Sequence, residues 1–138
     1  MIIPEHNHLI PERSGKTRRV VIAQHKIYLI TGEFDDGTLG EIFIRIDKEG
    51  SELRVYDALA IAISIGLQHG IPLETFAEKL CYQKFEPAGV TNDTEIPLAD
   101  SIVDYIFKKL TLWYGKKTED NQELKWRSGQ AFETIEEE

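Results

Sequence analysis

The sequence has few of the residues on which redox and covalent chemistry depend. Its 138 residues include one cysteine, Cys81, and one methionine. A single thiol cannot close an internal disulfide, so the chain by itself cannot deliver two electrons from a dithiol. Having no disulfide framework, it fits a reducing cytoplasm, and we expect Cys81 to be a small buried side chain.

Long hydrophobic runs are also absent. No apolar run approaches the roughly 20 residues that cross a bilayer. Residues 1–5, MIIPE, lack the basic and apolar parts of a signal peptide. The net charge is −8, whereas broad nucleic-acid binding needs a cationic surface. We therefore expect a cytoplasmic protein whose partners include neither membranes nor nucleic acids.

Motifs for catalysis and for metal binding are missing as well. Gly-x-Ser-x-Gly does not occur, and the glycines at 32, 37 and 40 have the wrong spacing for a P-loop or a dinucleotide fingerprint. His6 and His8 form a close pair, but only Glu5 and Glu12 accompany them, and structural zinc takes four ligands. The sequence predicts no metal and no cofactor, and His25 and His69 are expected to be structural or surface residues.

What the sequence does contain is an α+β pattern. Residues 17–47 alternate with period two and carry Asp36-Gly37 between two apolar runs, which predicts a hairpin in an antiparallel sheet of three to four strands. Its second strand is apolar on both faces. The period then changes to about 3.6 and predicts three helices packed on one face of the sheet, at about 51–69, 72–82 and 98–114.

Local signals refine this prediction. Ser51 is expected to cap the first helix and Gly70 to follow its end, with Pro72 opening the second helix. Residues 58–67 are apolar nearly all round, so we expect the first helix to be covered on most sides. Residues 83–97 read as an irregular loop. The predicted domains are an extended arm at 1–14, a folded domain at 15–115 and an acidic, partly disordered tail at 116–138.

Basic residues of the predicted sheet suggest a ligand site. Arg19, Lys26 and Arg45 are expected on the face opposite the helices, where Tyr28 can stack on a base. The strand–helix junction after Lys48 offers backbone N–H groups to an anion. The alternative is a solvated face with cross-strand pairs of Arg45 with Glu33 or Glu41. The candidate residues for an anion or nucleotide are Arg19, Lys26, Tyr28, Arg45, Lys48 and Arg54.

Most of the chain also carries a resemblance, seen in the segments 15–17, 25–29, 31–33, 36–37, 39–44, 48–50, 60–68, 70–74, 85–89, 92–93 and 101–107. These segments resemble the TSCPD domain, the small domain near the C-terminus of adenosylcobalamin-dependent (class II) ribonucleotide reductases. Residues 54–59, at the start of the first helix, depart from the family pattern. The catalytic barrel of those enzymes is absent from this sequence.

The resemblance implies an accessory module without catalytic activity of its own, which recognises a nucleotide or the catalytic subunit of a ribonucleotide reductase. Two alternatives stay open: an independent binding protein for a nucleotide-derived signal, and a structural assembly module. In the reductases this domain packs against the rest of a long chain. A separate copy must cover a sheet edge and a sheet face, so we expect a homodimer or a larger oligomer.

Overall fold

The structure is a computed structural model that describes residues 5–47 and 53–116. Its elements follow one another along the chain as β1 (Thr17–Ile22), β2 (His25–Glu33), β3 (Leu39–Ile46), α1 (Arg54–Gln68), α2 (Leu73–Leu80), β4 (Gly89–Val90), β5 (Leu98–Ala99) and α3 (Ile102–Tyr114). The predicted α+β class is confirmed.

The strands β1, β2 and β3 form an antiparallel sheet in sequence order. The predicted hairpin between β2 and β3 is confirmed: Gly37 has φ +88°, and the Asp36 carboxylate accepts a hydrogen bond of 3.0 Å from the backbone N–H of Thr38. Glycine adopts this left-handed conformation without a steric cost, which lets the chain reverse here.

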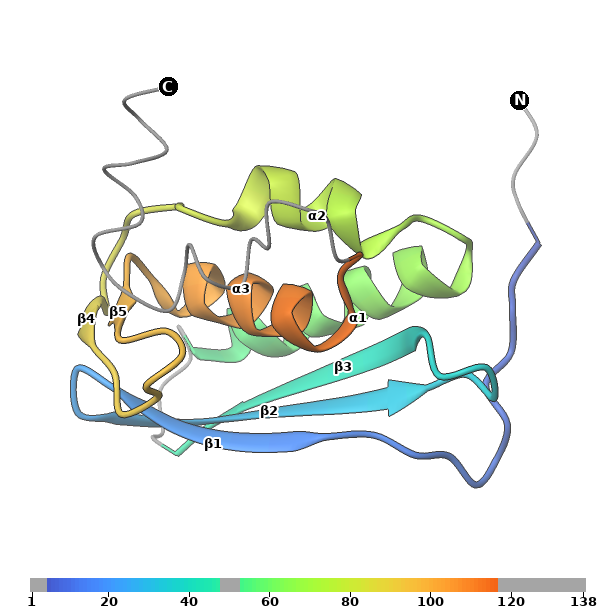
Figure 1. The fold of residues 1–138 in the computed structure, drawn as a ribbon, viewed down its shortest axis with the longest axis horizontal. Coiled ribbons are helices and arrows are strands. Elements are labelled where there is room, and N and C mark those ends of the chain that lie inside the picture. Colours follow the sequence, from blue (N-terminus) through green and yellow to red (C-terminus); the bar gives the residue numbers. More distant parts are fainter. Residues whose placement is uncertain (1–4, 48–52, 117–138) are drawn as a thin grey trace.

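The helices lie on one side of the sheet, in two layers (Figure 1). In Figure 1, α1 and α3 lie next to the sheet, and α2 lies beyond α3. Gly66 of α1 lets α2 approach, because a Cβ at this position would lie 2.6 Å from Cζ of Phe76. The three-stranded sheet therefore keeps one face that no described helix covers.

This layering buries α3 more fully than α1, the helix expected to be covered on most sides. The residues of α3 from Ile102 to Leu110 are all buried, including the charged side chains of its centre. By contrast, Ile61 and Ile65 of α1 are 61% and 54% exposed. The prediction that the first helix is covered on most sides is wrong within this chain, because α1 lies at the edge of the sheet and α3 takes the central position.

Both edges of the sheet are bonded within the chain. At the β3 edge, Ser64 of α1 accepts a hydrogen bond of 2.9 Å from the N–H of Ile42 and donates one of 3.2 Å to its carbonyl. At the β1 edge, the side-chain carbonyl of Asn92 accepts from the N–H of Val21 at 2.9 Å. Each edge is thus bonded in part within the chain, and one sheet face is covered by no described helix. That another copy covers the remaining surface stays a prediction.

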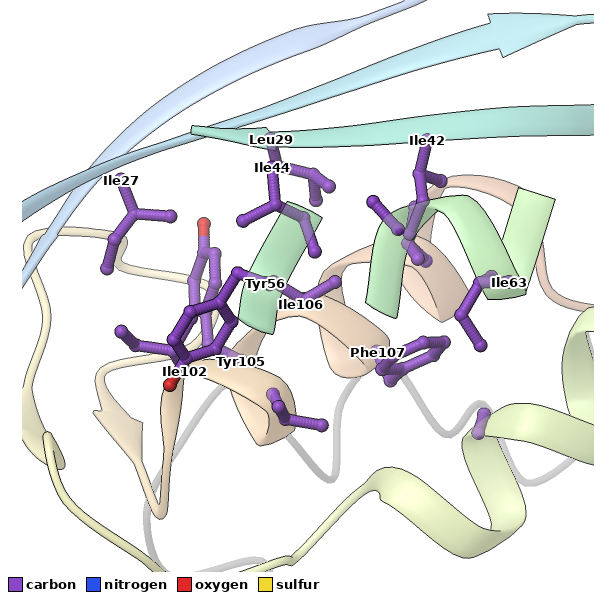
Figure 2. Packing of buried hydrophobic residues seen from close by; sticks show 14 of the residues in the cluster. Ile27, Leu29, Ile42, Ile44, Tyr56, Ile63, Ile102, Tyr105, Ile106 and Phe107 are labelled. Atoms are coloured by element: carbon purple, nitrogen blue, oxygen red, sulfur yellow. The ribbon is translucent and has the colours of Figure 1, made fainter. Parts of the chain in front are cut away.

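The hydrophobic core fills the space between the sheet and the helices. Figure 2 shows Ile27, Leu29, Ile42 and Ile44 pointing from the strands toward the aromatic side chains of the helices, Tyr105 and Phe107 among them. These side chains are almost fully buried. Such burial contributes roughly 1.5–3 kcal/mol for each large apolar side chain, so the sheet and α3 stabilise each other.

The start of the third helix and the segment before it differ from the prediction. The third helix begins at Ile102, because the Ser101 side chain caps it by accepting a hydrogen bond from the N–H of Asp104. Residues 98–99, expected in that helix, form β5 and pair with β4 in the segment expected to be irregular. Gly70 follows the end of α1 with φ +90°, as predicted, whereas Ser51 lies outside the described residues.

Candidate functional site

The uncovered sheet face carries a row of three side chains from three strands. The strand register places Arg19 of β1 opposite Tyr28 of β2, and Tyr28 opposite Arg45 of β3. Neighbouring strands lie about 4.8 Å apart, so the Cα atoms of the two arginines are about 10 Å apart with the aromatic ring between them. Both arginines are exposed, and Tyr28 is half-buried.

The rows on either side of this one differ in chemical character. Lys26, exposed and two residues before Tyr28 on the same strand, adds a third cation on the same side of the sheet. On the other side of the row, Ile30 lies opposite Phe43, which is 45% exposed. The face is therefore apolar at one end, and at the other it carries three cations together with one exposed acid, Asp47, which lies opposite Lys26.

The acidic residues expected to neutralise this face have other partners. Glu41 pairs with Arg13 at 2.9 Å, and Glu33 accepts a hydrogen bond from the hydroxyl of Tyr114. Arg45 lies opposite Tyr28 in the register, so the alternative of pairs between Arg45 and Glu33 or Glu41 is wrong. Within residues 5–47 and 53–116, none of the three cations Arg19, Lys26 and Arg45 forms an ion pair.

The structure thus brings together four of the six predicted ligand-binding residues: Arg19, Lys26, Tyr28 and Arg45. Arg54 is exposed in the first turn of α1, a different element. Lys48 lies outside the described residues, so its place at the strand–helix junction stays a prediction.

A buried ionic network is the feature that sequence reasoning missed. Asp93, in the segment between β4 and β5, accepts a hydrogen bond from the Tyr105 hydroxyl at 2.7 Å and lies 3.0 Å from Nζ of Lys109. Burial raises the pKa of Asp93, but the hydrogen bonds from Tyr105 and Lys109 outweigh it and hold that pKa below its ordinary value. The only indication of this network in the sequence was that charged residues occur within the otherwise apolar third helix.

A second buried pair holds both ends of the same segment. The Asp104 carboxylate accepts hydrogen bonds from the backbone N–H groups of Tyr82 and Asp100, and lies 3.0 Å from Nζ of Lys108. Both side chains of the pair are buried. Residues 82–100, here called the clamped segment, are therefore fixed to α3 at the two ends by Asp104 and in the middle by Asp93.

The clamped segment presents apolar side chains to solvent. Val90 of β4 is 71% exposed, and its cross-strand neighbour Leu98 is 46% exposed. Phe85, whose N–H donates to the carbonyl of Asp100, is 45% exposed. Exposed apolar side chains that lie close together are typical of a docking surface, and here the segment that carries them is fixed to α3.

A cleft of about 690 Å³ lies at another place, between the β2–β3 hairpin, the turn before α2 and the end of α3. Its lining includes the carboxylates of Asp35, Asp36 and Glu74 as well as Lys116. Because three acids outnumber the lysine, this cleft is electrostatically unsuited to a phosphate. The open sheet face, by contrast, has the charge that an anion requires.

The predicted close pair of His6 and His8 lies next to a third histidine, His69, at the end of α1. The ring of His6 lies 4.2 Å from that of His8 and 5.1 Å from that of His69, and it forms a hydrogen bond with Gln68. No group of three or more potential ligands in the described part of the chain is arranged to hold a metal ion. Likewise, none of the described helices is long and apolar enough to cross a membrane.

The fold and this face define a small α+β domain whose open surface is suited to binding. Comparison with known proteins then places the chain in a family: the profile of the TSCPD domain matches residues 6–114, and the chain belongs to that family. No solved structure matches it. The predicted resemblance is confirmed.

Curated relatives of the chain include vitamin B12-dependent ribonucleotide reductases. The protein of Bradyrhizobium diazoefficiens is 44% identical over 116 residues, which are 83% of this chain and 9% of that protein. The protein of Agrobacterium fabrum is 46% identical over 112 residues, 80% of this chain and 9% of that protein. For Streptantibioticus cattleyicolor the identity is 42% over 110 residues, 79% of this chain and 18% of that protein. The chain thus matches a small part of each relative.

Proposed function

We propose that this domain is a non-catalytic recognition module of the ribonucleotide reductase family, and that it binds a nucleotide through its open sheet face. The observation that carries the proposal is the row of Arg19, Tyr28 and Arg45, whose arginines form no ion pair with a described acidic side chain. The reductases to which the chain is similar supply the substrate class, since their reaction concerns ribonucleotides.

The chemistry of the row suits such a ligand. A guanidinium group can donate two parallel hydrogen bonds to one phosphate, so two arginines about 10 Å apart can hold the two ends of a polyphosphate. Tyr28, between them, offers a ring on which a base or a ribose can stack. Lys26 adds charge without a fixed geometry.

A single-thiol chain is a poor candidate for ribonucleotide reduction, and burial makes its thiol less reactive still. Cys81 is 9% exposed, and burial, together with the charge of Asp104, raises the pKa of its thiol to about 12. A thiol with that pKa is almost entirely protonated at neutral pH and is a weak nucleophile. This supports binding, rather than turnover, as the work of the domain.

The test is a thermal-shift panel of nucleoside mono-, di- and triphosphates, followed by calorimetric titration. A ligand at 100 times its dissociation constant should add about 2.7 kcal/mol to the free energy of unfolding. The double substitution Arg19→Ala and Arg45→Ala should weaken binding at least about 10-fold, since it removes two charge-assisted contacts. It should leave the melting temperature of the free protein unchanged.

Lys79→Ala is the matched control, because it removes one exposed cation from α2, away from the sheet. Binding that survives the double substitution, or that falls equally with Lys79→Ala, would contradict the proposed site. A panel without any shift would reject nucleotide recognition and would leave an assembly role.

The clamped segment favours a second candidate function, docking on the catalytic chain of a vitamin B12-dependent ribonucleotide reductase. Val90 and Leu98 are exposed apolar neighbours on a segment that two buried ion pairs fix to α3. With a purified reductase chain that lacks this domain, Val90→Glu should abolish the complex while nucleotide binding persists. The sheet-face double substitution should have the reverse effect, so the two candidate functions are separable.

A further inference from the structure

Helix α1 presents an apolar side to solvent over its whole length. Val55, Ile61 and Ile65 are 65%, 61% and 54% exposed, and the two alanines between them, Ala58 and Ala62, are exposed as well. No other helix among the described residues exposes three large apolar side chains. These five residues are here called the α1 stripe. They are the apolar residues of α1 that stay exposed when the helix packs against the rest of the chain.

The helical period explains where the stripe points. At 100° per residue, Ser64 and Gln68 face the β3 edge, where both form hydrogen bonds to the backbone. Tyr56, Ala60, Ile63 and Leu67 are the buried residues of the core side. The stripe occupies a separate sector of roughly 120°, so it is free to contact another molecule without disturbing the sheet or the core.

We infer that the α1 stripe is the interface with a second copy of this chain, packed antiparallel about a two-fold axis that passes near Ile61 and Ala62. This axis places Ala58 of one copy opposite Ile65 of the other, and Ile61 opposite Ala62. Ile61 and Ile65 therefore each meet an alanine, which favours close packing of two helices, whereas Val55 lies at the end of the contact, opposite Gln68 of the other copy. A two-fold contact of this kind is self-complementary and closed.

The charge of α1 selects the antiparallel arrangement. The single charged residue in the sector is Arg54, in the first turn, where its charge opposes the positive end of its own helix dipole. The last turn contains no basic residue. In an antiparallel pair Arg54 lies beside the negative end of the other α1, whereas a parallel pair would bring the two arginines together.

Sedimentation of the full chain over a range of concentrations tests the inference. The wild type should be a dimer at micromolar concentration, and Ile65→Glu should be a monomer, with its dissociation constant raised at least about 100-fold by the buried carboxylates. Val90→Glu is the matched control, since it replaces an exposed apolar side chain on β4 with the same charge and should leave the dimer intact. Circular dichroism establishes that each variant is folded.

Disulfide trapping tests the position of the axis. In Ala62→Cys the new thiols of the two copies lie next to the axis, so mild oxidation should convert most of the protein to a covalent dimer. Wild type, whose Cys81 is buried, and Lys79→Cys, with an exposed thiol on α2, should stay uncrosslinked. A wild type that is monomeric throughout would overturn the inference, as would a dimer that tolerates Ile65→Glu or a variant Ala62→Cys that does not crosslink.

This interface does not depend on the proposed nucleotide site, because the stripe and the row lie on different elements. Ile65→Glu should leave the nucleotide affinity of the sheet face unchanged, and Arg19→Ala with Arg45→Ala should leave the dimer unchanged. Loss of one property without the other therefore tells which of the two proposals has failed.

Discussion

Tyr105 and Asp93 are joined inside the molecule: the phenolic hydroxyl of Tyr105 donates to Oδ2 of Asp93 over 2.7 Å, and both side chains are buried. The bond connects the N-terminal part of α3 with the segment between β4 and β5. The ion pair of Lys109 with Asp93 and the hydrogen bond of Val21 to Asn92 hold the middle of the clamped segment together with this bond. The polar interior of this small domain thus determines the shape of one of its surfaces.

Removing that hydroxyl should destabilise the protein. Tyr105→Phe keeps the ring in the core but takes one donor away from a buried carboxylate, which costs about 1–3 kcal/mol. Urea unfolding measures the loss. Tyr28→Phe, which removes a hydroxyl from the open sheet face, is the control and should change the free energy of unfolding by less than about 0.5 kcal/mol.

The same carboxylate should make stability depend on acidity. Because the folded state lowers the pKa of Asp93 below its ordinary value of 3.8, the folded form binds its proton less readily than the unfolded form. Its contribution is therefore present above about pH 4 and is lost as the pH falls toward the folded pKa. Urea unfolding between pH 2.5 and about 6 should show this loss.

In Asp93→Asn the corresponding part of the acid dependence should be missing. Asp57→Asn, at an exposed position in the first turn of α1, supplies the comparison for the loss of one carboxylate. If Asp93→Asn kept the full slope of the wild type, the carboxylate would not be a determinant of acid stability.

Ser64→Ala should lower the free energy of unfolding, because it removes a hydrogen-bond partner from the β3 edge of the sheet. The hydroxyl serves both the N–H and the carbonyl of Ile42, which are part-buried beside α1. Leaving these groups without partners costs about 1–3 kcal/mol, although alanine is the better helix former. Hydrogen exchange at the Ile42 amide should accelerate, whereas Ser14→Ala, at an exposed serine, should alter neither stability nor exchange.

Cys81 should resist alkylation in the folded protein. Burial, with the charge of Asp104, raises its thiol pKa to about 12, and little of the side chain is accessible. Reaction with a thiol reagent at pH 8 should be at least about 100-fold slower in buffer than in denaturant, because both the thiolate fraction and access are reduced. Equal rates in the two conditions would show that the thiol is open to solvent in the folded state.

The sheet and its open face were predictable from local sequence. Period-two alternation in residues 17–47 and the Asp36-Gly37 turn place Arg19, Tyr28 and Arg45 on one side of the sheet, and the register then aligns them in one row. Pattern alone could not exclude pairs between Arg45 and the glutamates. These pairs are excluded because Arg13 and Tyr114, which lie far from the glutamates in sequence, bind the glutamates instead.

The helices show where local patterns stop being informative. The apolar run at 58–67 resembles a buried helix, yet Ile61 and Ile65 are exposed, while Lys108 of α3 is fully buried. The hydrophobicity of a helix shows that its residues can be buried. Which helix is in fact buried depends on the order in which the layers pack. A buried lysine is stable only beside a carboxylate such as Asp104, and this contact exists only after the chain has folded.

The amino-acid sequence by itself determined the strands, the turn, the approximate extent of the helices and the membership of the family, because these follow from short-range periodicity and from motifs along the chain. Only the tertiary structure decided which helix is central, which groups of the two sheet edges find partners within the chain and which apolar side chains stay outside. Those outcomes depend on packing between residues far apart in sequence, where the burial of one surface is gained at the expense of another.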